Sequence, residues 1–175
     1  MTNKTMILCL GLKNSGKTLF LRTLASYPKS IGTKETVPTV GTNLIHVSFK
    51  RSNHSFTIQE IGGEMQQLWP QYFDDSKAII YVIDQSSAID ISSNFVRLME
   101  ILTHQNVKSI KPILLILNKI DLNGPSSVDD IIEALFIPEM IKSFPMNRIN
   151  LIKCSCSNGQ GIDEVMKWME QLPRK

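Results

Sequence analysis

The sequence contains no apolar run long enough for a membrane-spanning helix. None of its stretches approaches the 18 or more apolar residues that such a helix needs, and the start Met-Thr-Asn-Lys lacks the apolar run of a signal peptide. Residue 2 is Thr rather than Gly, and the chain ends in Leu-Pro-Arg-Lys without a prenylation cysteine. We therefore expect a cytoplasmic protein without a direct lipid anchor.

Cysteine is scarce. Cys9, Cys154 and Cys156 form no spaced framework of the kind that disulfide-rich or zinc-binding domains show. If Cys154 and Cys156 lie on a strand they alternate faces, so that their thiols point apart. This pattern disfavours a disulfide or a metal site and indicates reduced, structural thiols.

The chain also lacks a strong charge of one sign. Its formal net charge is +3, and its Lys and Arg residues are scattered, which disfavours a nucleic-acid or membrane footprint. The sequence shows no repeat, linker or low-complexity tract, and a chain of this length buries about 70% of its unfolded surface in one core. We expect residues 1–175 to form a single, monomeric domain that does not bind nucleic acid.

Strand-like and helix-like patterns alternate along the chain. Continuous apolar runs predict strands at residues 6–10, 78–84, 112–118 and 151–155. Helical periodicity predicts helices over residues 16–26, 88–104, 128–136 and 161–172. Residues 44–50 and 55–60 form a predicted antiparallel hairpin. This order predicts an α/β fold with a six-stranded, mainly parallel sheet, one antiparallel edge strand and helices on both faces.

A phosphate-binding motif follows the first predicted strand. Residues 11–18 match G-x-x-x-x-G-K-[ST] directly before a predicted helix. Its glycines let backbone N–H groups converge on a β-phosphate, Lys17 neutralises oxygens between the β- and γ-phosphates, and Thr18 offers a hydroxyl to Mg²⁺. The predicted phosphate-binding residues are Gly11, Lys13, Asn14, Ser15, Gly16, Lys17, Thr18 and Leu19. Kinases and ATPases share this loop, so another motif must select the base.

The motif Asn118-Lys119-Ile120-Asp121 follows the fifth strand-like run. Guanine presents two adjacent donors that the carboxylate of Asp121 can accept together, whereas adenine has no matching pair. Asn118 can bond the base edge or brace the phosphate loop, and the stem of Lys119 can lie along the purine. Guanine is therefore favoured over adenine.

A short segment after the last predicted strand is a further candidate. A backbone N–H within Ser155-Cys156-Ser157 could contact the guanine O6, although a short Ser-rich turn is equally compatible with these residues. Ser155 and Cys156 are therefore added to the predicted nucleotide-binding residues.

Taken together, these motifs resemble those of the Arf-like small GTPases, over nearly the whole chain. The resemblance includes residues 38–41, Gly62-Gly63, residues 69–73, and Gly161 with Trp168. Within the family, residues 39–44 and 60–63 are most similar to the subgroup of ADP-ribosylation-factor-like protein sixteen. The resemblance implies the P-loop NTPase fold of small GTPases and a GTP-binding molecular switch.

By this resemblance, Thr39 binds Mg²⁺ and senses the γ-phosphate, and Gly63 offers its backbone N–H to that phosphate. The implied switch regions are residues 29–43 and 61–75, which relax when the γ-phosphate is lost. The alternative is that Pro38-Thr39 simply turns the chain. The resemblance also implies GTP/GDP and Mg²⁺ as cofactors, effector proteins on the switch regions, an exchange factor and a GTPase-activating protein.

Two departures from the family concern catalysis. Glu60 stands where the family has Asp, and it can still reach Mg²⁺ through a water molecule. Glu64 stands where the family has the Gln that orients the attacking water, and a carboxylate cannot donate a hydrogen bond. Because losing one such contact costs about 2.7–4 kcal/mol, we expect slow intrinsic GTP hydrolysis, with Lys17, Thr39 and Glu64 in the catalytic positions. Alternatively, Glu64 swings into solvent and a partner supplies the catalytic group.

Other departures concern partners and activity. The family's three exposed effector-binding aromatics correspond to Thr42, Gln59 and Tyr72, so that one aromatic remains. The sequence favours a trafficking or signalling switch, with a constitutively GTP-bound, catalytically inactive scaffold as the alternative. A phosphate-loop kinase is disfavoured because the arginines are dispersed and suggest no phosphoryl-clamping lid.

Overall fold

The computed structural model describes residues 5–28, 36–49, 54–107, 111–124, 126–144 and 148–173. In this part of the chain six strands form one sheet in the order β2-β3-β1-β4-β5-β6. The strands are β1 (Thr5–Leu10), β2 (Thr42–Phe49), β3 (His54–Ile61), β4 (Ala78–Asp84), β5 (Ile113–Asn118) and β6 (Ile149–Lys153). Only the β2–β3 pair is antiparallel among them, and β2 lies at the edge. The predicted mainly parallel sheet with one antiparallel edge strand is confirmed.

The central strands are apolar on both faces. In β4, Ile80 and Val82 belong to one hydrophobic core, whereas Ile79 and Tyr81 belong to the other. Neighbouring side chains of a strand point to opposite faces, so a continuous apolar run buries itself only where both faces are covered. The continuous run in the sequence therefore places β4 inside the sheet.

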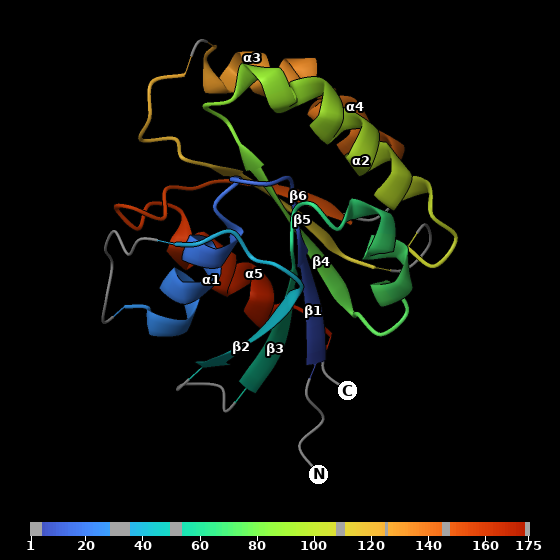
Figure 1. Cartoon of the computed structure of the whole chain (residues 1–175), viewed down its shortest axis with the longest axis vertical. Helices are drawn as coiled ribbons and strands as arrows, with labels where there is room; N and C mark the ends of the chain where they lie inside the picture. The colour runs from blue at the N-terminus through green and yellow to red at the C-terminus, as the bar shows by residue number, and fades with distance from the viewer. Residues whose placement is uncertain are drawn as a thin grey trace.

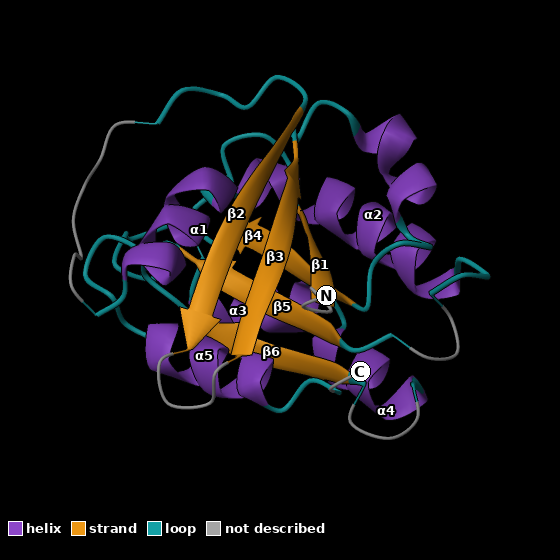
Figure 2. Cartoon of the chain, turned by 90° about the horizontal axis from the view of Figure 1, so that it is seen from below, coloured by secondary structure: helices purple, strands orange, loops and turns teal. Residues whose placement is uncertain are grey.

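Helices cover both faces of the sheet (Figure 1). One face carries α1 (Lys17–Ser26) and α5 (Ile162–Glu170), and the other carries α2 (Ile91–Thr103), α3 (Val128–Ala134) and α4 (Ile137–Ser143). Figure 2 shows the same two helical layers from below, on either side of the strands. Two 3-10 helices, η1 (Gln66–Tyr72) and η2 (Ala88–Asp90), complete the described helices.

The helix predicted over residues 128–136 is shorter than expected, and a second helix follows it. A capping box between Ser127 and Asp130 starts α3, and Phe136 with φ 51° separates α3 from α4. Pro138 lies in the first turn of α4, where it costs no intrahelical hydrogen bond. The sequence did not predict α4, because a proline in a short apolar segment is equally compatible with a loop.

The last strand ends earlier than predicted, which changes the position of two cysteines. Since β6 ends at Lys153, neither Cys154 nor Cys156 lies on a strand, and both side chains are buried in the same core. A hydrogen bond between the two thiols, together with burial, raises the pKa of Cys156 well above its usual value. The expectation that these thiols point apart is therefore wrong, and Cys156 remains a protonated, structural thiol.

Two predicted segments lie partly outside the described residues. These are residues 29–35 of the first switch region and residues 51–53 of the hairpin turn. In the described part of the chain, no helix combines the length and the apolar character needed to cross a bilayer.

Several loops meet at the carboxyl end of the sheet. The parallel strands β1, β3, β4, β5 and β6 all end there, and β1 lies between β3 and β4. After β1 the chain first adds strands on the β3 side of β1 and then on its β4 side, so the direction of the strand order reverses at β1. Open α/β sheets bind their ligands in the crevice at such a point of reversal. The fold therefore places the phosphate-loop motif at the expected position of a ligand site.

Candidate functional site

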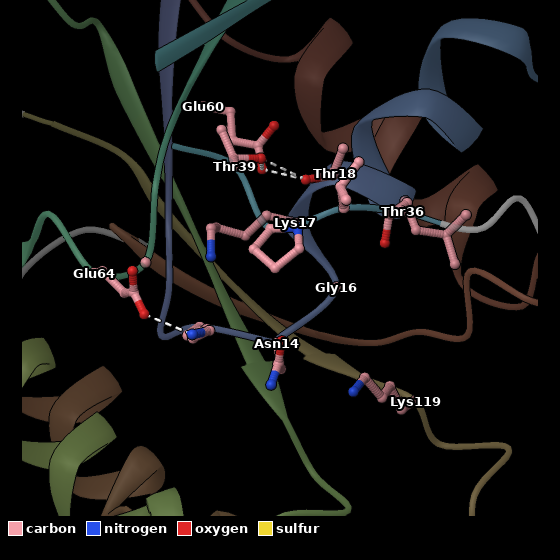
Figure 3. Close-up of a pocket in the computed structure, with 14 residues that line it drawn as sticks. Asn14, Gly16, Lys17, Thr18, Thr36, Thr39, Glu60, Glu64 and Lys119 are labelled. Carbon is pink, nitrogen blue, oxygen red and sulfur yellow. Dashed lines mark hydrogen bonds and ion pairs between the residues drawn. The ribbon is translucent and has the colours of Figure 1, made fainter. Parts of the chain in front are cut away.

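A cavity of about 440 Å³ opens at this end of the sheet (Figure 3). Its walls come from the phosphate loop, from residues 36–39, from the end of β3 and its following turn, and from the loop after β5. The lining residues are Lys13, Asn14, Gly16, Lys17, Thr18, Leu19, Thr36, Val37, Pro38, Thr39, Glu60, Gly63, Glu64 and Lys119. Segments far apart in the sequence thus form one hollow.

The phosphate loop forms the floor of this cavity. Gly16 adopts φ 89° directly before α1, and a Cβ atom there would lie 2.4 Å from the side-chain nitrogen of Asn118. The ammonium of Lys17 donates to the carbonyl oxygens of Gly11 at 3.0 Å and Leu12 at 2.8 Å. Burial lowers the pKa of Lys17, so an anion beside it would gain from a poorly hydrated positive charge.

Three oxygen-bearing side chains meet on one wall of the cavity. The Thr18 hydroxyl donates to Glu60 Oε1 at 2.5 Å, and the Thr39 hydroxyl donates to the same oxygen at 3.1 Å (Figure 3). The two hydroxyl oxygens lie 3.0 Å apart. Asn43 reaches the other carboxylate oxygen of Glu60 at 3.4 Å. Glu60 is completely buried, and these hydrogen bonds give both of its carboxylate oxygens a partner.

This oxygen cluster fits a magnesium ion. Mg²⁺ takes oxygen ligands and keeps few protein side chains, with water and phosphate oxygens supplying the remainder. Thr18, Thr39 and Glu60 are all oxygen donors within hydrogen-bond reach of one another. In the described part of the chain, no group of three or more His, Cys, Asp and Glu side chains forms a metal site of the all-protein kind.

The two glycines after β3 lie against the neighbouring loops. A Cβ atom on Gly63 would lie 2.4 Å from the backbone nitrogen of Lys13, and one on Gly62 would lie 2.5 Å from the carbonyl oxygen of Thr39. The N–H of Gly62 also donates to the carbonyl of Gly41 at 2.9 Å. Only glycine permits these close approaches, which connect residues 39–41 to the turn after β3.

Glu64 forms an ion pair across the cavity mouth. Its carboxylate accepts from the Lys13 ammonium at 2.6 Å (Figure 3). This hydrogen bond and the lysine charge lower the pKa of Glu64, so the carboxylate is ionised at neutral pH. The charge that occupies the family's glutamine position therefore has a partner on the phosphate loop.

Asn118 joins the loop after β5 to the phosphate loop. Its side-chain nitrogen donates to the carbonyl of Ser15 at 2.9 Å, and its side-chain oxygen accepts from the Cys156 thiol at 3.1 Å. The sequence left two roles open for Asn118, a bond to the base edge and a brace for the phosphate loop. The structure shows the hydrogen bond that braces the phosphate loop. Both polar ends of this buried amide are satisfied.

Lys119 and its neighbours are held by residues that the sequence did not reveal. The Lys119 ammonium pairs with Asp84 at 2.6 Å, and Gln85 donates to the carbonyls of Lys119 and Leu122 at 2.8 and 2.9 Å. Asp84 and Gln85 lie at the end of the apolar run of β4, and that position was the one available signal. These contacts fix the loop that carries Asp121.

Asp121 is exposed beside the loop after β6. Hydrogen bonds lower its pKa, first from Ser155 and then from Ser157, whose hydroxyl lies 2.7 Å from the carboxylate. The N–H of Ser155 donates to the carbonyl of Gln160 at 3.0 Å, so that group is used within the loop. The second carboxylate partner, Ser157, was not among the predicted site residues.

Most of the predicted residues line the cavity, but some lie next to it. Those that do not line it are Gly11, Ser15, Asn118, Asp121, Ser155 and Cys156. Conversely, Thr36 and Val37 line the cavity without having been singled out individually. Their position just before Thr39, inside the predicted switch region, was the only signal for them.

The strand order, the phosphate loop between β1 and α1, and the N-K-x-D loop after β5 define a small GTPase fold. Residues 1–172 match the model of the ADP-ribosylation factor family. The chain belongs to this family, whose guanine-nucleotide binding supports a GTP-binding switch.

Several curated proteins resemble the chain along most of its length. The human ADP-ribosylation factor-like protein 16 is 29% identical over 97% of this chain and 86% of its own. ADP-ribosylation factor-like protein 3 of Chlamydomonas reinhardtii is 34% identical over 93% of this chain and 87% of its own. ADP-ribosylation factor-like protein 6 of zebrafish (Danio rerio) is 31% identical over 96% of this chain and 88% of its own.

A solved structure shares the fold. The Arl6 (BBS3) small GTPase of Trypanosoma brucei, determined with the bound nucleotide analogue GppNp, superposes with a TM-score of 0.80 at 23% identity. The match covers 97% of this chain and 96% of that protein.

Proposed function

We propose that this chain binds GTP and GDP with Mg²⁺ and changes its protein contacts through switch I, residues 29–43, and switch II, residues 61–75. The observation that carries the proposal is the meeting of Thr18, Thr39 and Glu60 at one point of the cavity, beside Gly63. A ligand at this point would contact the phosphate loop and both switch regions at once. Losing its terminal phosphate would release the two switch regions together.

Each part of the nucleotide has candidate partners in the chain. The backbone N–H groups of residues 11–19 hold the α- and β-phosphates, with Lys17 neutralising the oxygens between the β- and γ-phosphates. Asp121 accepts from the guanine base, Lys119 lies along it, and Asn118 braces the loop beneath. A backbone N–H of the Ser155-Cys156 segment is the proposed contact for O6, and because the Ser155 N–H is already used, we assign it to Cys156.

Magnesium binding belongs to the same proposal. Thr18 and Thr39 would hold the ion directly, and Glu60 would hold it through water, since its carboxylate already lies within reach of both hydroxyls. When bound, Mg²⁺ would neutralise negative charge on the phosphate groups. The Thr18 and Thr39 hydroxyls and the Glu60 carboxylate would hold the ion in position.

The same site supports slow hydrolysis. Lys17, Thr39 and Glu64 occupy the catalytic positions, and Glu64 presents an ionised carboxylate where a hydrogen-bond donor is needed to orient water. The missing contact corresponds to about a hundredfold or more in rate. We infer that GTP remains bound for long periods unless a GTPase-activating partner supplies the missing group.

Effector proteins are the proposed partners. Val37, Val40 and Leu44 expose 79%, 95% and 55% of their surface around switch I, and half-buried Tyr72 follows in switch II. Apolar side chains grouped in this way beside a nucleotide site favour a protein interface. The proposed setting is trafficking or signalling in the cytoplasm, with residues 1–175 acting as one monomeric domain and an exchange factor restoring GTP.

Titration with labelled GDP and GTP in magnesium buffer tests the binding step, which requires saturable uptake of both. Single-turnover hydrolysis then compares the wild type with Glu64→Gln, and Glu139→Gln on the exposed side of α4 serves as the matched control. We expect Glu64→Gln to hydrolyse GTP faster and the control to equal the wild type. A wild-type rate equal to that of ordinary small GTPases would contradict slow hydrolysis.

A constitutively GTP-bound scaffold is the second candidate, and Glu64 is the observation that favours it. The two candidates differ in the nucleotide that the purified protein carries. Chromatography of the extracted nucleotide should show almost only GTP for the scaffold and a mixture of GTP and GDP for the slowly hydrolysing switch. The scaffold should also bind its partner equally well whichever guanine nucleotide is supplied.

A further inference from the structure

The ion pair between Lys13 and Glu64 joins the phosphate loop to the first turn of switch II. Its two charged atoms are 2.6 Å apart, and the side chains keep 51% and 68% of their surface exposed. Both residues line the 440 Å³ cavity together with Lys17 and Gly63. The phosphate-loop motif does not specify the residue at position 13, so the motif alone does not indicate a pair between Lys13 and Glu64.

We propose that Lys13, which belongs to the phosphate loop, also uses its side chain to select triphosphate over diphosphate, its ammonium exchanging Glu64 for the γ-phosphate. This inference rests on the proposed guanine-nucleotide binding and gives the Lys13 side chain a role in it. No proton is transferred in this exchange. The Lys13 ammonium breaks its contact with the Glu64 carboxylate and forms one with the γ-phosphate. Glu64 is left free to turn towards solvent.

The position of Lys13 supports this assignment. Its backbone nitrogen lies next to Gly63, so closely that a Cβ on that glycine would lie 2.4 Å away. Gly63 in turn is the proposed γ-phosphate contact of switch II. The side chain of Lys13 therefore starts beside the place where the terminal phosphate would lie, and a diphosphate would leave it without a phosphate partner.

Among the described lysines that line the cavity, Lys13 has the side-chain contact that an incoming anion can replace most easily. Lys17 is buried and donates to two backbone carbonyls of its own loop. Lys119 pairs with Asp84, whose side chain is only 11% exposed. The Lys13 contact is with an exposed carboxylate instead, and exposed ion pairs contribute little because water screens them.

The chemistry of the competing anions favours exchange. A terminal phosphate carries more negative charge than a carboxylate and has three acceptor oxygens. Other charged groups near Lys13 are committed elsewhere. It also borders a second hollow with Asp90 and Arg97, but Asp90 accepts from Ser87 and Arg97 pairs with Glu100.

The test measures the affinities of GDP and of a non-hydrolysable GTP analogue in magnesium buffer. The variants are Lys13→Met, Lys13→Arg, Glu64→Gln and the Lys13→Met/Glu64→Gln double variant, with Lys142→Met on exposed α4 as the control. We expect Lys13→Met to weaken analogue binding about fivefold to tenfold while GDP binding changes less than about twofold, since one charge-assisted contact is lost. Lys13→Arg and Lys142→Met should retain the wild-type ratio of the two affinities.

Glu64→Gln should shift the ratio towards the analogue, because it removes both the competing anion and a repulsive charge. The double variant should lose that gain, since no ammonium remains to use it. The Lys13→Met effect should also shrink as salt is raised, as it does for exposed charges. An unchanged ratio in Lys13→Met, or an equal loss of both nucleotides, would overturn the assignment while leaving guanine-nucleotide binding intact. Failure of the wild type to bind either nucleotide would instead remove the proposed function.

Discussion

Asn118 and Ser15 are 103 residues apart in the sequence and are joined by a buried hydrogen bond of 2.9 Å, from the side-chain amide of Asn118 to the carbonyl of Ser15. Asn118 is 2% exposed and Ser15 is also 2% exposed. One contact therefore couples the loop after β5 to the phosphate loop. Because the bond is inaccessible to water, losing it leaves the carbonyl unsatisfied.

Replacing Asn118 by Ala should weaken both halves of the site. The change removes the donor to Ser15 and the acceptor of the Cys156 thiol, at a cost of about 1–3 kcal/mol. For a chain of this size each kcal/mol corresponds to a decrease of about 2–4 °C in Tm. Thermal denaturation measures the loss of stability, and nucleotide titration should show weaker binding of both GDP and GTP.

The matched control for this variant is Asn123→Ala, which changes an exposed amide in the same loop. It should leave both the Tm and the affinities close to those of the wild type. If Asn118→Ala melted like this control, the brace would carry no stability.

Replacing Asp121 by Asn should change the preferred base. In the proposed site the carboxylate would accept from two guanine donors, whereas an amide offers one acceptor and one donor, which suits the additional carbonyl of xanthine. We expect guanine nucleotides to bind at least about a hundredfold more weakly, the typical size for leaving buried polar groups unpaired, and xanthine nucleotides to bind more tightly. Competition titrations with both nucleotides measure the change.

Asp75→Asn provides the control, because Asp75 is an exposed aspartate far from the base loop in sequence. It should retain the wild-type preference for guanine. Equal guanine affinities in Asp121→Asn and Asp75→Asn would exclude Asp121 as the base-selecting residue.

The protonation of Asp121 gives a pH-dependent prediction. Hydrogen bonds from Ser155 and then Ser157 hold its pKa below the ordinary value. A lowered folded pKa means that the associated stability is present above the unfolded pKa, near 3.9, and is lost as the pH falls through the folded pKa. Ser155→Ala should move the pKa of Asp121 up towards its usual value, which an NMR titration of the carboxyl carbon can follow.

Ser86→Ala, in which the lost hydroxyl contacts Asp84 instead, is the comparison for this titration. It should leave the pKa of Asp121 where it is in the wild type. A titration curve for Asp121 that did not respond to Ser155→Ala would show that the hydroxyl of Ser155 does not hold the charge.

The parts of the fold that could be predicted were those with local signatures. The continuous apolar run of β4 indicated a strand buried on both faces, and the motif at residues 11–18 placed Lys17 and Thr18 at the start of a helix from sequence alone. By contrast, α4 has few residues and a proline in its first turn, so its periodicity was too short to detect.

The missed contacts of the site depend on distances across the sheet. Asp84 pairs with Lys119 because β4 and β5 are neighbours with Asp84 opposite Asn118. The pairing of Lys13 with Glu64 likewise depends on β1 lying beside β3. Sequence spacing carries no such information, since residues far apart in the chain meet only once the strand order is known.

Glu60 provides a prediction for metal binding. Its buried carboxylate accepts from both Thr18 and Thr39, so Glu60→Gln would remove the negative charge that faces these hydroxyls. We expect about tenfold more Mg²⁺ to be needed for half-maximal retention of a GTP analogue, as for other changes next to a metal's direct ligands. Nucleotide release measured across a series of Mg²⁺ concentrations gives this value.

The exposed Glu139→Gln variant is again the control, and its Mg²⁺ dependence should match that of the wild type. Were Glu60→Gln to behave in the same way, the oxygen cluster would not be the magnesium site. Thermal denaturation separates this result from simple unfolding.

Lys111 should hold the end of switch II in place. Its ammonium donates to the carbonyl of Ser76 at 2.6 Å and to that of Phe73, just after η1, and burial lowers its pKa. Lys111→Met keeps most of the apolar stem but leaves these carbonyls without their donor, which costs about 1–3 kcal/mol. We expect a lower Tm and faster amide hydrogen exchange over residues 73–77. The control is Lys77→Met, which changes an exposed side chain in the same segment and should exchange at wild-type rates. Lys111 itself lies in the segment before β5. If Lys111→Met exchanged its amide hydrogens at wild-type rates, the packed side chains of Trp69 and Phe73 would anchor this segment, and the ammonium would not.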